Sequence, residues 1–290
     1  TNSISENEIV ITSKNGEARR LLLDGKKASI MKLGQILRVV WLVPSMDRLW
    51  TEGSSGRRQF LDRLTLSYFP KHAEVSLLYE KAMKERNRLL KERIYNDQWY
   101  NALEIEMAKS AVTIQKSRMQ AIQYLTEAQN QLTGNFPKAE LLLIDPEQNI
   151  ITDEDEAVRA LKCSRQNDMI IGRTSVGPHK SDLQAIYLNK SMPAKDSSTG
   201  EQKALLISII LSNAKSLAKI SNVSPIVLLD EVSAHLDNER RAALYDEICQ
   251  LGVQAWMTGT ELELFSELKD KAQFIEVTAA DGISTLSVSS

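Results

Sequence analysis

The stretch Pro225-Ile-Val-Leu-Leu-Asp-Glu231 decides the fold, because four apolar residues in it lead into two carboxylates. Such a run is typical of a buried parallel strand that delivers its acids to the carboxyl edge of a sheet, where ligands bind. In nucleoside triphosphatases the first acid holds Mg²⁺, usually through water, and the second polarises the attacking water. We therefore expect Asp230 and Glu231 to be catalytic, with Asp230 as the metal ligand. Many α/β proteins carry a strand followed by acids, so the neighbouring motifs must decide.

Two further segments follow this strand. Ser233-Ala-His-Leu-Asp237 comes directly after it, and residues 239 to 248 predict a helix. This is where an ABC ATPase has its D-loop. Residues 253 to 257 predict another short strand, which ends at Thr258-Gly-Thr260, where ABC heads usually place a switch histidine. Thr258 or Thr260 offers a hydroxyl to a phosphate, although an ordinary strand-ending turn is an equal alternative.

Upstream, Ser197-Ser-Thr-Gly-Glu-Gln-Lys203 precedes an apolar run from 204 to 217 that predicts a buried helix. Ser198 and Glu201 fit a capping box at the start of that helix. Free backbone N–H groups and the helix dipole also attract phosphate there, and Gly200 leaves room for it. We expect these motifs to contact ATP through a set of residues at the sheet edge and the helix start: Ser198, Thr199, Gly200, Glu201, Gln202, Asp237, Thr258 and Thr260.

The order of the motifs is more specific than any one of them. The signature loop is Ser198 to Gln202, the Walker B strand is the run that ends in Asp230 and Glu231, and the D-loop is Ser233 to Asp237. Within about forty residues, these three motifs in this order predict an α/β ABC-ATPase head, lobe I. Residues 71 to 133 contain no glycine or proline and predict a helical arm, lobe II, inserted into the head. Asn96-Asp97 is the expected cap between two antiparallel helices. We expect the first part of lobe I at 1–70, lobe II at 71–165 and the second part of lobe I at 166–290.

Two apolar stripes at helical spacing are expected to form the core of the arm rather than a recognition surface. They consist of Val75, Leu78, Ala82, Leu89 and Ile94, and of Trp99, Leu103, Met107, Ala111, Ile114 and Leu125. Before the arm, Asn15-Gly16 and Asp24-Gly25 predict turns between small strands. Residues 36 to 43 predict a buried strand that ends at Pro44.

Composition sets further limits. The net charge of -2 and the pI near 6.0 give no global footprint for nucleic acid, so any such footprint must be local. The two cysteines favour a reducing compartment, and the apolar stretches are shorter than the roughly 20 residues of a membrane helix. We expect a cytoplasmic, nucleoid-associated protein.

The basic candidates for DNA contact are Arg57, Arg58, Arg63, Lys81, Lys84, Arg86, Arg88, Lys91 and Arg93. The alternative is that these residues belong to a solvated helix face or form structural ion pairs.

At this point the motifs resemble the RecF family, bacterial recombination and replication-repair ATPases related to SMC proteins. The resemblance rests on four segments that span most of the chain. They are Leu42-Val-Pro-Ser-Met-Asp-Arg-Leu49 with Gly56-Arg-Arg-Gln-Phe-Leu-Asp62, Tyr79 with Arg86-Asn-x-Leu-Leu-Lys91, Thr174-x-x-Gly-Pro-His-Lys-Ser-Asp-Leu183, and Ser198-Thr-Gly-Glu-Gln-Lys203. Lys180 and Ser45-Met46 depart from the family pattern.

The family's P-loop, Gly-x-x-Gly-x-Gly-Lys-Thr, is missing from these 290 residues, and Gly53-Ser-Ser-Gly-Arg57 lacks the Lys-Ser/Thr pair that would replace it. We expect the loop to lie upstream of Thr1 in a longer protein, so that this chain is inactive alone while the complete protein is a slow DNA-dependent ATPase.

The resemblance implies an ATP-dependent homodimer that uses ATP and Mg²⁺, clamps DNA at gaps between single strand and duplex, and supports RecO- and RecR-mediated recombinase loading and the SOS response. Asp230 and Glu231 would act in cis, and Ser198, Gly200 and Asp237 in trans. The alternatives are a non-catalytic DNA- or partner-binding fragment, and another SMC-like head of the RecN or overcoming-lysogenization type.

Overall fold

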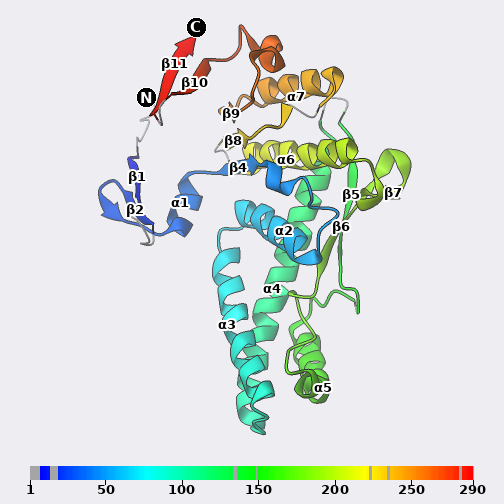
Figure 1. The fold of residues 1–290 in the computed structure, drawn as a ribbon. Coiled ribbons are helices and arrows are strands. Elements are labelled where there is room, and N and C mark those ends of the chain that lie inside the picture. The colour runs from blue at the N-terminus through cyan, green and yellow to red at the C-terminus, as the bar shows by residue number, and fades with distance from the viewer. Residues whose placement is uncertain are drawn as a thin grey trace.

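The computed structural model describes residues 7–13, 19–132, 136–147, 149–221, 224–233, 236–280 and 283–289. Figure 1 shows a head from which two long helices extend side by side. The strands are β1 (Ile9–Thr12), β2 (Arg20–Leu23), β3 (Lys26–Lys27), β4 (Val39–Leu42), β5 (Ala139–Ile144), β6 (Asp182–Tyr187), β7 (Met192–Pro193), β8 (Ile226–Leu229), β9 (Ala255–Met257), β10 (Phe274–Ala280) and β11 (Ile283–Ser289). The α-helices are α1 (Ile30–Ile36), α2 (Ser54–Tyr68), α3 (His72–Lys91), α4 (Asp97–Gln129), α5 (Glu154–Ile171), α6 (Thr199–Ser221) and α7 (Asn238–Leu251). Short 3₁₀ turns are η1 (Pro44–Met46), η2 (Leu188–Lys190), η3 (Ala194–Asp196) and η5 (Leu262–Leu268).

The run that ends in Asp230 forms the centre of a parallel sheet, as predicted. β8 lies between β4 and β9 and pairs in parallel with both. Val227 and Leu229 face the same side as Val40 and Leu42 of β4, and all four are at most 2% exposed. Since all three strands are parallel, their carboxyl ends meet at one edge, and Asp230 lies there.

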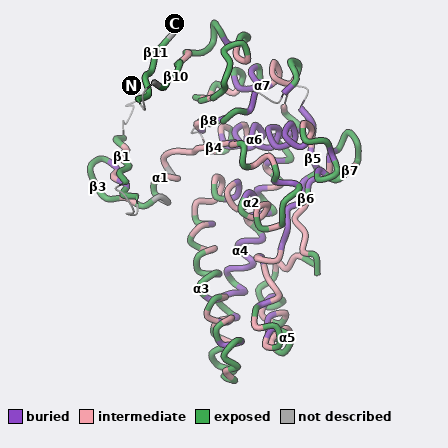
Figure 2. The backbone as a smooth tube through the Cα atoms, viewed as in Figure 1, coloured by how far each residue is buried: buried purple, intermediate pink, exposed green. Residues whose placement is uncertain are grey.

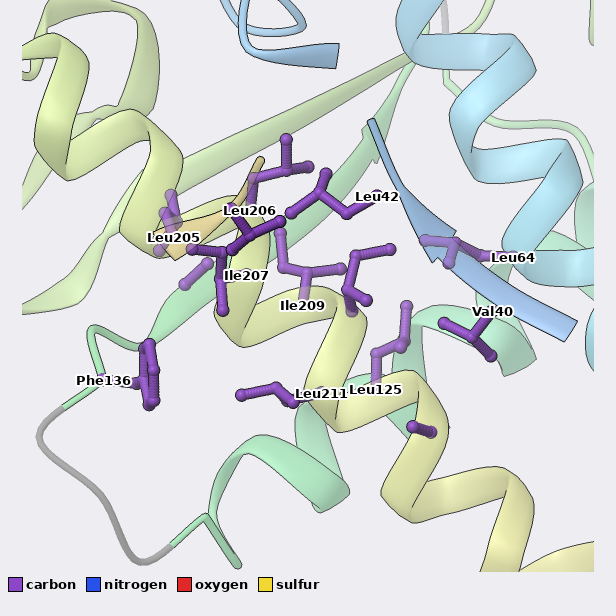
Figure 3. Close-up of a cluster of buried hydrophobic side chains, with 14 of the residues drawn as sticks. Val40, Leu42, Leu64, Leu125, Phe136, Leu205, Leu206, Ile207, Ile209 and Leu211 are labelled. Carbon is purple, nitrogen blue, oxygen red and sulfur yellow. The ribbon is translucent and has the colours of Figure 1, made fainter. Parts of the chain in front are cut away.

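Helix α6 is the core helix of the head. Its residues from Gln202 to Ala214 are buried, and Figure 2 shows this burial along the helix. Figure 3 places Leu206 and Ile207 of α6 among the same buried cluster as Val40 and Leu42. Among the described helices α6 is long and apolar enough to cross a membrane, but 72% of its apolar window is buried inside the protein, as expected of a core helix.

The arm consists of α3 and α4, which run antiparallel (Figure 1). The Asn96 side chain accepts a hydrogen bond from the Trp99 N–H, so the predicted cap is confirmed. Most of the predicted stripe residues are buried or half-buried, but Leu78 and Trp99 are 45% and 40% exposed. Both were therefore predicted wrongly as core residues. Leu78 lies at the edge of the buried stripe of α3, where it lines an open groove with Lys81 and Leu103, and the Trp99 ring lies under the exposed Arg88, at 5.4 Å.

No helix or strand ends at residue 165, the predicted boundary between lobe II and the second part of lobe I. Helix α5 continues to Ile171 across that predicted boundary, and Gly172, with φ of 71°, ends it. Strand β5, which lies within the range predicted for the arm, pairs antiparallel with β6. The division into lobes therefore remains a prediction, and the range 71–165 does not coincide with the ends of the elements.

The first forty residues differ in part from expectation. Asp24 and Gly25, with φ of 51° and 72°, form the predicted turn between β2 and β3, whereas Asn15-Gly16 lies outside the described residues. The strand predicted from Ile36 begins only at Val39. The residues before it form α1 because the Ser29 side chain caps that helix by accepting from the Lys32 N–H.

A set of buried polar contacts joins the arm to the head. Arg118 of α4 donates to both carboxylate oxygens of Asp62 in α2, at 2.8 and 2.9 Å, and to the Pro178 carbonyl at 2.8 Å. His72 also contacts Asp62, at 2.9 Å. Burial alone would raise the pKa of Asp62, but the bonds from His72 and Arg118 and their charges hold this pKa at about 2.

A second buried cluster lies inside the arm. Arg86 of α3 is 0% exposed, and its guanidinium donates to Glu104 of α4 at 3.1 Å and to Asp168 of α5 at 2.7 Å. It also donates to Thr174 at 2.9 Å. Both carboxylates have side-chain exposures of 0%. These contacts tie the two arm helices to α5 and to the segment that follows it.

Candidate functional site

The structure brings three of the predicted site residues together at the carboxyl edge of the parallel sheet. Asp230 and Glu231 follow β8, and Thr258 follows β9. The Thr258 hydroxyl donates to Asp230 Oδ1 at 2.6 Å and accepts from the Glu231 N–H at 3.0 Å. The Thr258 N–H donates to the Leu229 carbonyl at 3.0 Å, which extends the β8–β9 pairing to this point. One threonine thus connects both acids.

Glu231 has an unusual backbone conformation. Its φ is 51°, in the left-handed region that residues with a side chain seldom adopt. Such a conformation persists only where its surroundings enforce it, and it is frequent at functional sites. Both Asp230 and Glu231 are exposed, so their carboxylates are accessible from solvent.

Two residues that the sequence analysis did not propose as site residues complete this edge. Lys203 of α6 is only 4% exposed, and its Nζ lies 3.4 Å from Asp47 Oδ2 and 3.4 Å from the Glu231 carbonyl oxygen. Asp47 follows η1, directly after β4. Each residue stands in a segment quoted for the family resemblance, but their spacing of 156 positions hides the contact.

The signature loop forms the predicted capping box. The Ser198 N–H and hydroxyl donate to Glu201 Oε2 at 3.0 and 2.9 Å, and Ser198 Oγ accepts from the Glu201 N–H at 3.4 Å. Lys190 pairs with Glu201 Oε1 at 2.5 Å. The Lys190 side chain, with the Ser198 N–H and hydroxyl, lowers the pKa of Glu201 to about 2. An ionised carboxylate therefore occupies the helix start.

Space for a phosphate remains beside this loop. Thr199 begins α6 and is exposed, and a Cβ built on Gly200 would meet nothing within 4 Å. Gln202 differs from the prediction: it is 5% exposed, and its amide donates to the carbonyls of Ser197 and Lys195 at 2.9 and 3.2 Å. Because a buried amide must be hydrogen-bonded, Gln202 holds the loop rather than facing solvent.

The remaining predicted nucleotide contacts lie at the starts and ends of elements. Asp237 caps α7 by accepting from the Arg240 N–H at 2.8 Å, and residues 238 to 251 form the expected helix. Thr260 is exposed two residues beyond Thr258. Within the D-loop, Ser233 is buried and accepts from the Tyr245 hydroxyl at 3.0 Å, and residues 234 and 235 lie outside the described residues.

The acidic edge fits one part of an Mg²⁺–nucleotide site. Mg²⁺ is usually held by one or two carboxylates together with substrate phosphates and water. Asp230 supplies one exposed carboxylate beside the Thr258 hydroxyl. The described residues contain no group of three or more His, Cys, Asp or Glu that could hold a metal by themselves. The donor set therefore suits an ion shared with a phosphate chain.

Four of the arginines predicted to contact DNA have structural partners. Arg57 forms a bidentate pair with Asp182 at 2.8 and 2.9 Å, and Arg58 donates to Ser54 and to the Ser181 carbonyl. Arg63 lies over the Trp41 ring at 4.4 Å, and burial lowers its pKa to about 10. Arg86 is fully buried, so as a DNA contact it was predicted wrongly.

The other candidates are exposed on the arm. Arg88 pairs with Glu85 at 2.6 Å and with Glu92 at 3.2 Å, so it forms the local ion pairs that were the alternative to DNA contact. Lys81, Lys84 and Lys91 line the groove beside α4, and no ion pair joins them to the residues that the structure describes. Arg93 follows α3, is exposed and has a φ of 51°.

Comparison with known proteins identifies relatives of this chain. No model of a protein family matches the chain. The DNA replication and repair protein RecF of Mesorhizobium japonicum is 44% identical over 268 residues, which cover 89% of this chain and 71% of that protein. RecF of Brucella suis is also 44% identical, over 278 residues that cover 92% of this chain and 72% of that protein.

Solved structures show the same fold. The recombination mediator protein RecF with ATP, described as part of the RecFOR pathway, aligns with a TM-score of 0.79 over 98% of this chain and 78% of that one, at 22% identity. The structure of RecF-ATPrS aligns with the same TM-score. The fold is therefore the α/β fold of an ABC-ATPase head with an inserted helical arm, and the chain belongs to the RecF family of DNA replication and repair proteins.

Proposed function

We propose that this protein acts in replication and recombinational repair as part of an ATP-dependent dimeric clamp on DNA. The observation that carries the proposal is the joining of Asp230 and Glu231 by the Thr258 hydroxyl at the carboxyl edge of the parallel sheet. That edge is where α/β folds bind ligands. The relatives solved with nucleotide belong to the same family.

In this proposal each residue has one task. Asp230 would hold Mg²⁺, and Glu231 would orient and polarise the water that attacks the γ-phosphate. Ser198, Gly200 and Asp237 contact the nucleotide of the opposing subunit. For Ser198 this requires exchange, because its N–H and hydroxyl already bond to Glu201. The incoming phosphate would take the place of that carboxylate at the helix start.

DNA contact in the proposal falls on the arm rather than on the head arginines. Lys81, Lys84 and Lys91 are exposed cations on one side of α3, and such groups neutralise backbone phosphates without reading sequence. The expected substrate is gapped DNA, with RecO and RecR as partners in recombinase loading and the SOS response. A cytoplasmic, nucleoid-associated location fits these tasks.

The nucleotide part is tested first on the coding sequence. The protein expressed from the whole reading frame should dimerise with ATP, and a reading frame without a Gly-x-x-Gly-x-Gly-Lys-Thr segment would contradict this part of the proposal. In that protein Glu231→Gln should slow hydrolysis by roughly a hundredfold or more while keeping the ATP-bound dimer. Ser198→Arg should prevent dimerisation but not ATP binding. Unchanged turnover of the first variant would remove Glu231 from the reaction.

The DNA part is tested by filter binding of the 290-residue chain to single-stranded and gapped DNA across a salt series. Replacing Lys81, Lys84 and Lys91 with Gln should weaken binding and reduce the salt slope by about 2 for single strands. The matched control replaces three exposed lysines of α4 and α5, Lys109, Lys116 and Lys162, and should bind as the unaltered chain does. Equal losses of DNA affinity in both triple variants would contradict a DNA contact at Lys81, Lys84 and Lys91.

A second candidate function is a non-catalytic DNA- or partner-binding module. The observation in its favour is that the 290 residues hold no P-loop. It predicts DNA binding that does not respond to ATP in the protein from the whole reading frame. ATP-dependent dimerisation there would exclude it.

A further inference from the structure

Both polar groups of the Glu231 backbone are held by side chains from other elements. Its N–H donates to Thr258 Oγ1 at 3.0 Å, and its carbonyl oxygen lies 3.4 Å from Lys203 Nζ. The residue between these two contacts has a φ of 51°. Since a left-handed glutamate is unfavourable by itself, the contacts on either side of Glu231 must stabilise this backbone conformation.

Lys203 is a buried lysine whose ammonium group lies close to both Asp47 and the Glu231 carbonyl. It lies within the first two turns of α6, is 4% exposed, and contacts the Glu231 carbonyl and Asp47. A buried ammonium group requires acceptors, and these two contacts provide them. Asp47 is itself incompletely partnered, because its buried Oδ1 has no hydrogen bond to any of the residues that the structure describes. Lys203 therefore joins the ends of β4 and β8 to the signature helix.

We propose that Lys203 is a positioning residue that keeps Glu231 in its left-handed conformation. The proposal rests on the role of Glu231 given above. The direction of a Cα–Cβ bond follows from the backbone dihedrals, so a relaxed Glu231 would point its carboxylate in another direction than the one the left-handed backbone sets. Thr258 fixes the N–H side of this residue, and Lys203 fixes the carbonyl side.

The position of Lys203 in α6 gives this contact a further consequence. Ser198 directly precedes the helix, and Lys203 follows Thr199 by four residues, about 6 Å along the axis. The helix is buried over the next three turns, so its first turns move with the core rather than separately. Lys203 therefore keeps its distance to Glu231 as long as α6 and β8 stay packed in the same core.

Amide hydrogen exchange measures this directly. The 290-residue chain, labelled with ¹⁵N-glutamate, reports the exchange rate of the Glu231 N–H by NMR. Lys203→Met should raise that rate at least tenfold, because the carbonyl side is released, whereas Lys203→Arg should stay within threefold of the unaltered chain. A rate within twofold for Lys203→Met would overturn the proposal.

Two controls separate positioning from general stability and from charge. Lys215→Met removes a comparable contact from the same helix, the 2.7 Å pair with the buried Glu247, and should leave the Glu231 rate within twofold. Asp47→Asn should also leave it within twofold. If Asp47→Asn raises the rate as much as Lys203→Met does, Lys203 only neutralises Asp47 and the proposal is wrong.

The outcome is separable from that of the proposed function. Should Lys203→Met fail to fold, Lys203→Gln takes its place with the same expected rise, because its amide ends one bond closer to the backbone than the ammonium and does not reach a carbonyl that Nζ meets at 3.4 Å. The measurement needs no nucleotide. If the Glu231 N–H of Lys203→Met exchanges fast but no form of the protein hydrolyses ATP, Lys203 still positions Glu231 and only the catalytic role of Glu231 is wrong. If exchange is unchanged and hydrolysis is normal, the positioning proposal is wrong and the proposed function stands.

Discussion

The Thr258 hydroxyl lies 2.6 Å from Asp230 Oδ1, and this hydrogen bond joins the ends of two neighbouring parallel strands. The same oxygen accepts the N–H of the next residue, Glu231, at 3.0 Å. A serine can make both bonds, whereas a valine of similar shape can make neither. The two acids thus depend on one hydroxyl for their mutual placement.

Thr258→Val should lower the free energy of unfolding by about 1 kcal/mol, because two exposed hydrogen bonds of modest net value are lost. Thr258→Ser should stay within about 0.5 kcal/mol of the unaltered chain, since it keeps the hydroxyl. Urea titration followed by circular dichroism measures both. A larger loss for serine than for valine would mean that the methyl group, not the hydroxyl, is important here.

Glu231→Gly should be more stable than Glu231→Ala by about 1 kcal/mol, because glycine adopts a φ of 51° without the steric cost that any Cβ brings. Both variants lose the carboxylate, so their difference reports the backbone alone. The measurement is the midpoint of urea unfolding at equal slope. Equal stabilities would show that Glu231 is not left-handed in solution.

Arg86→Met should cost about 3–5 kcal/mol, because it leaves the fully buried Glu104 and Asp168 without their shared partner. Arg88→Met, two residues along the same helix, is the matched control. Its pairs with Glu85 and Glu92 are exposed, so its cost should remain within about 1 kcal/mol. Thermal unfolding of the two variants, compared with the parent chain, distinguishes a structural Arg86 from a surface one.

Asp62 should make the free energy of unfolding depend on pH in the acid range. Its pKa of about 2 in the folded chain lies below the usual value of about 3.9 for an unfolded aspartate. The folded state therefore gains stability from this group above about pH 4, and loses that contribution as the pH falls toward 2. Asp62→Asn should be less stable at pH 7, where Arg118 loses its bidentate partner, and should show a shallower decline between pH 4 and 2. Parallel slopes for both proteins would contradict this assignment.

Local patterns in the sequence were enough to predict several elements. The run before Asp230 predicted β8, the Ser198–Glu201 capping box predicted the start of α6, and Asn96 predicted the break between α3 and α4. In each case a short-range physical rule operates: strand patterning, side-chain capping of free N–H groups, or the absence of glycine and proline. The order of these motifs also predicted the family, which the relatives at 44% identity confirm.

Contacts between distant segments could not be predicted in this way. Arg86 and Arg88 differ by two positions in one helix, and only the packing of α4 and α5 makes the first fully buried and leaves the second exposed. Leu78 has helical spacing yet lies at the rim of the arm groove, because the crossing of the two helices decides which side of a stripe is covered.

The sequence by itself determined the kind of protein: an acid-ended strand, a capped signature helix and a glycine-free arm, each set by interactions within a few residues. The tertiary structure alone decided how the site is held. Thr258 meets Asp230 across 28 positions and Lys203 meets the Glu231 carbonyl across 28 others, because parallel strands and a buried helix bring their ends to one edge. Such contacts depend on the direction of each side chain after packing, and no local pattern contains that information.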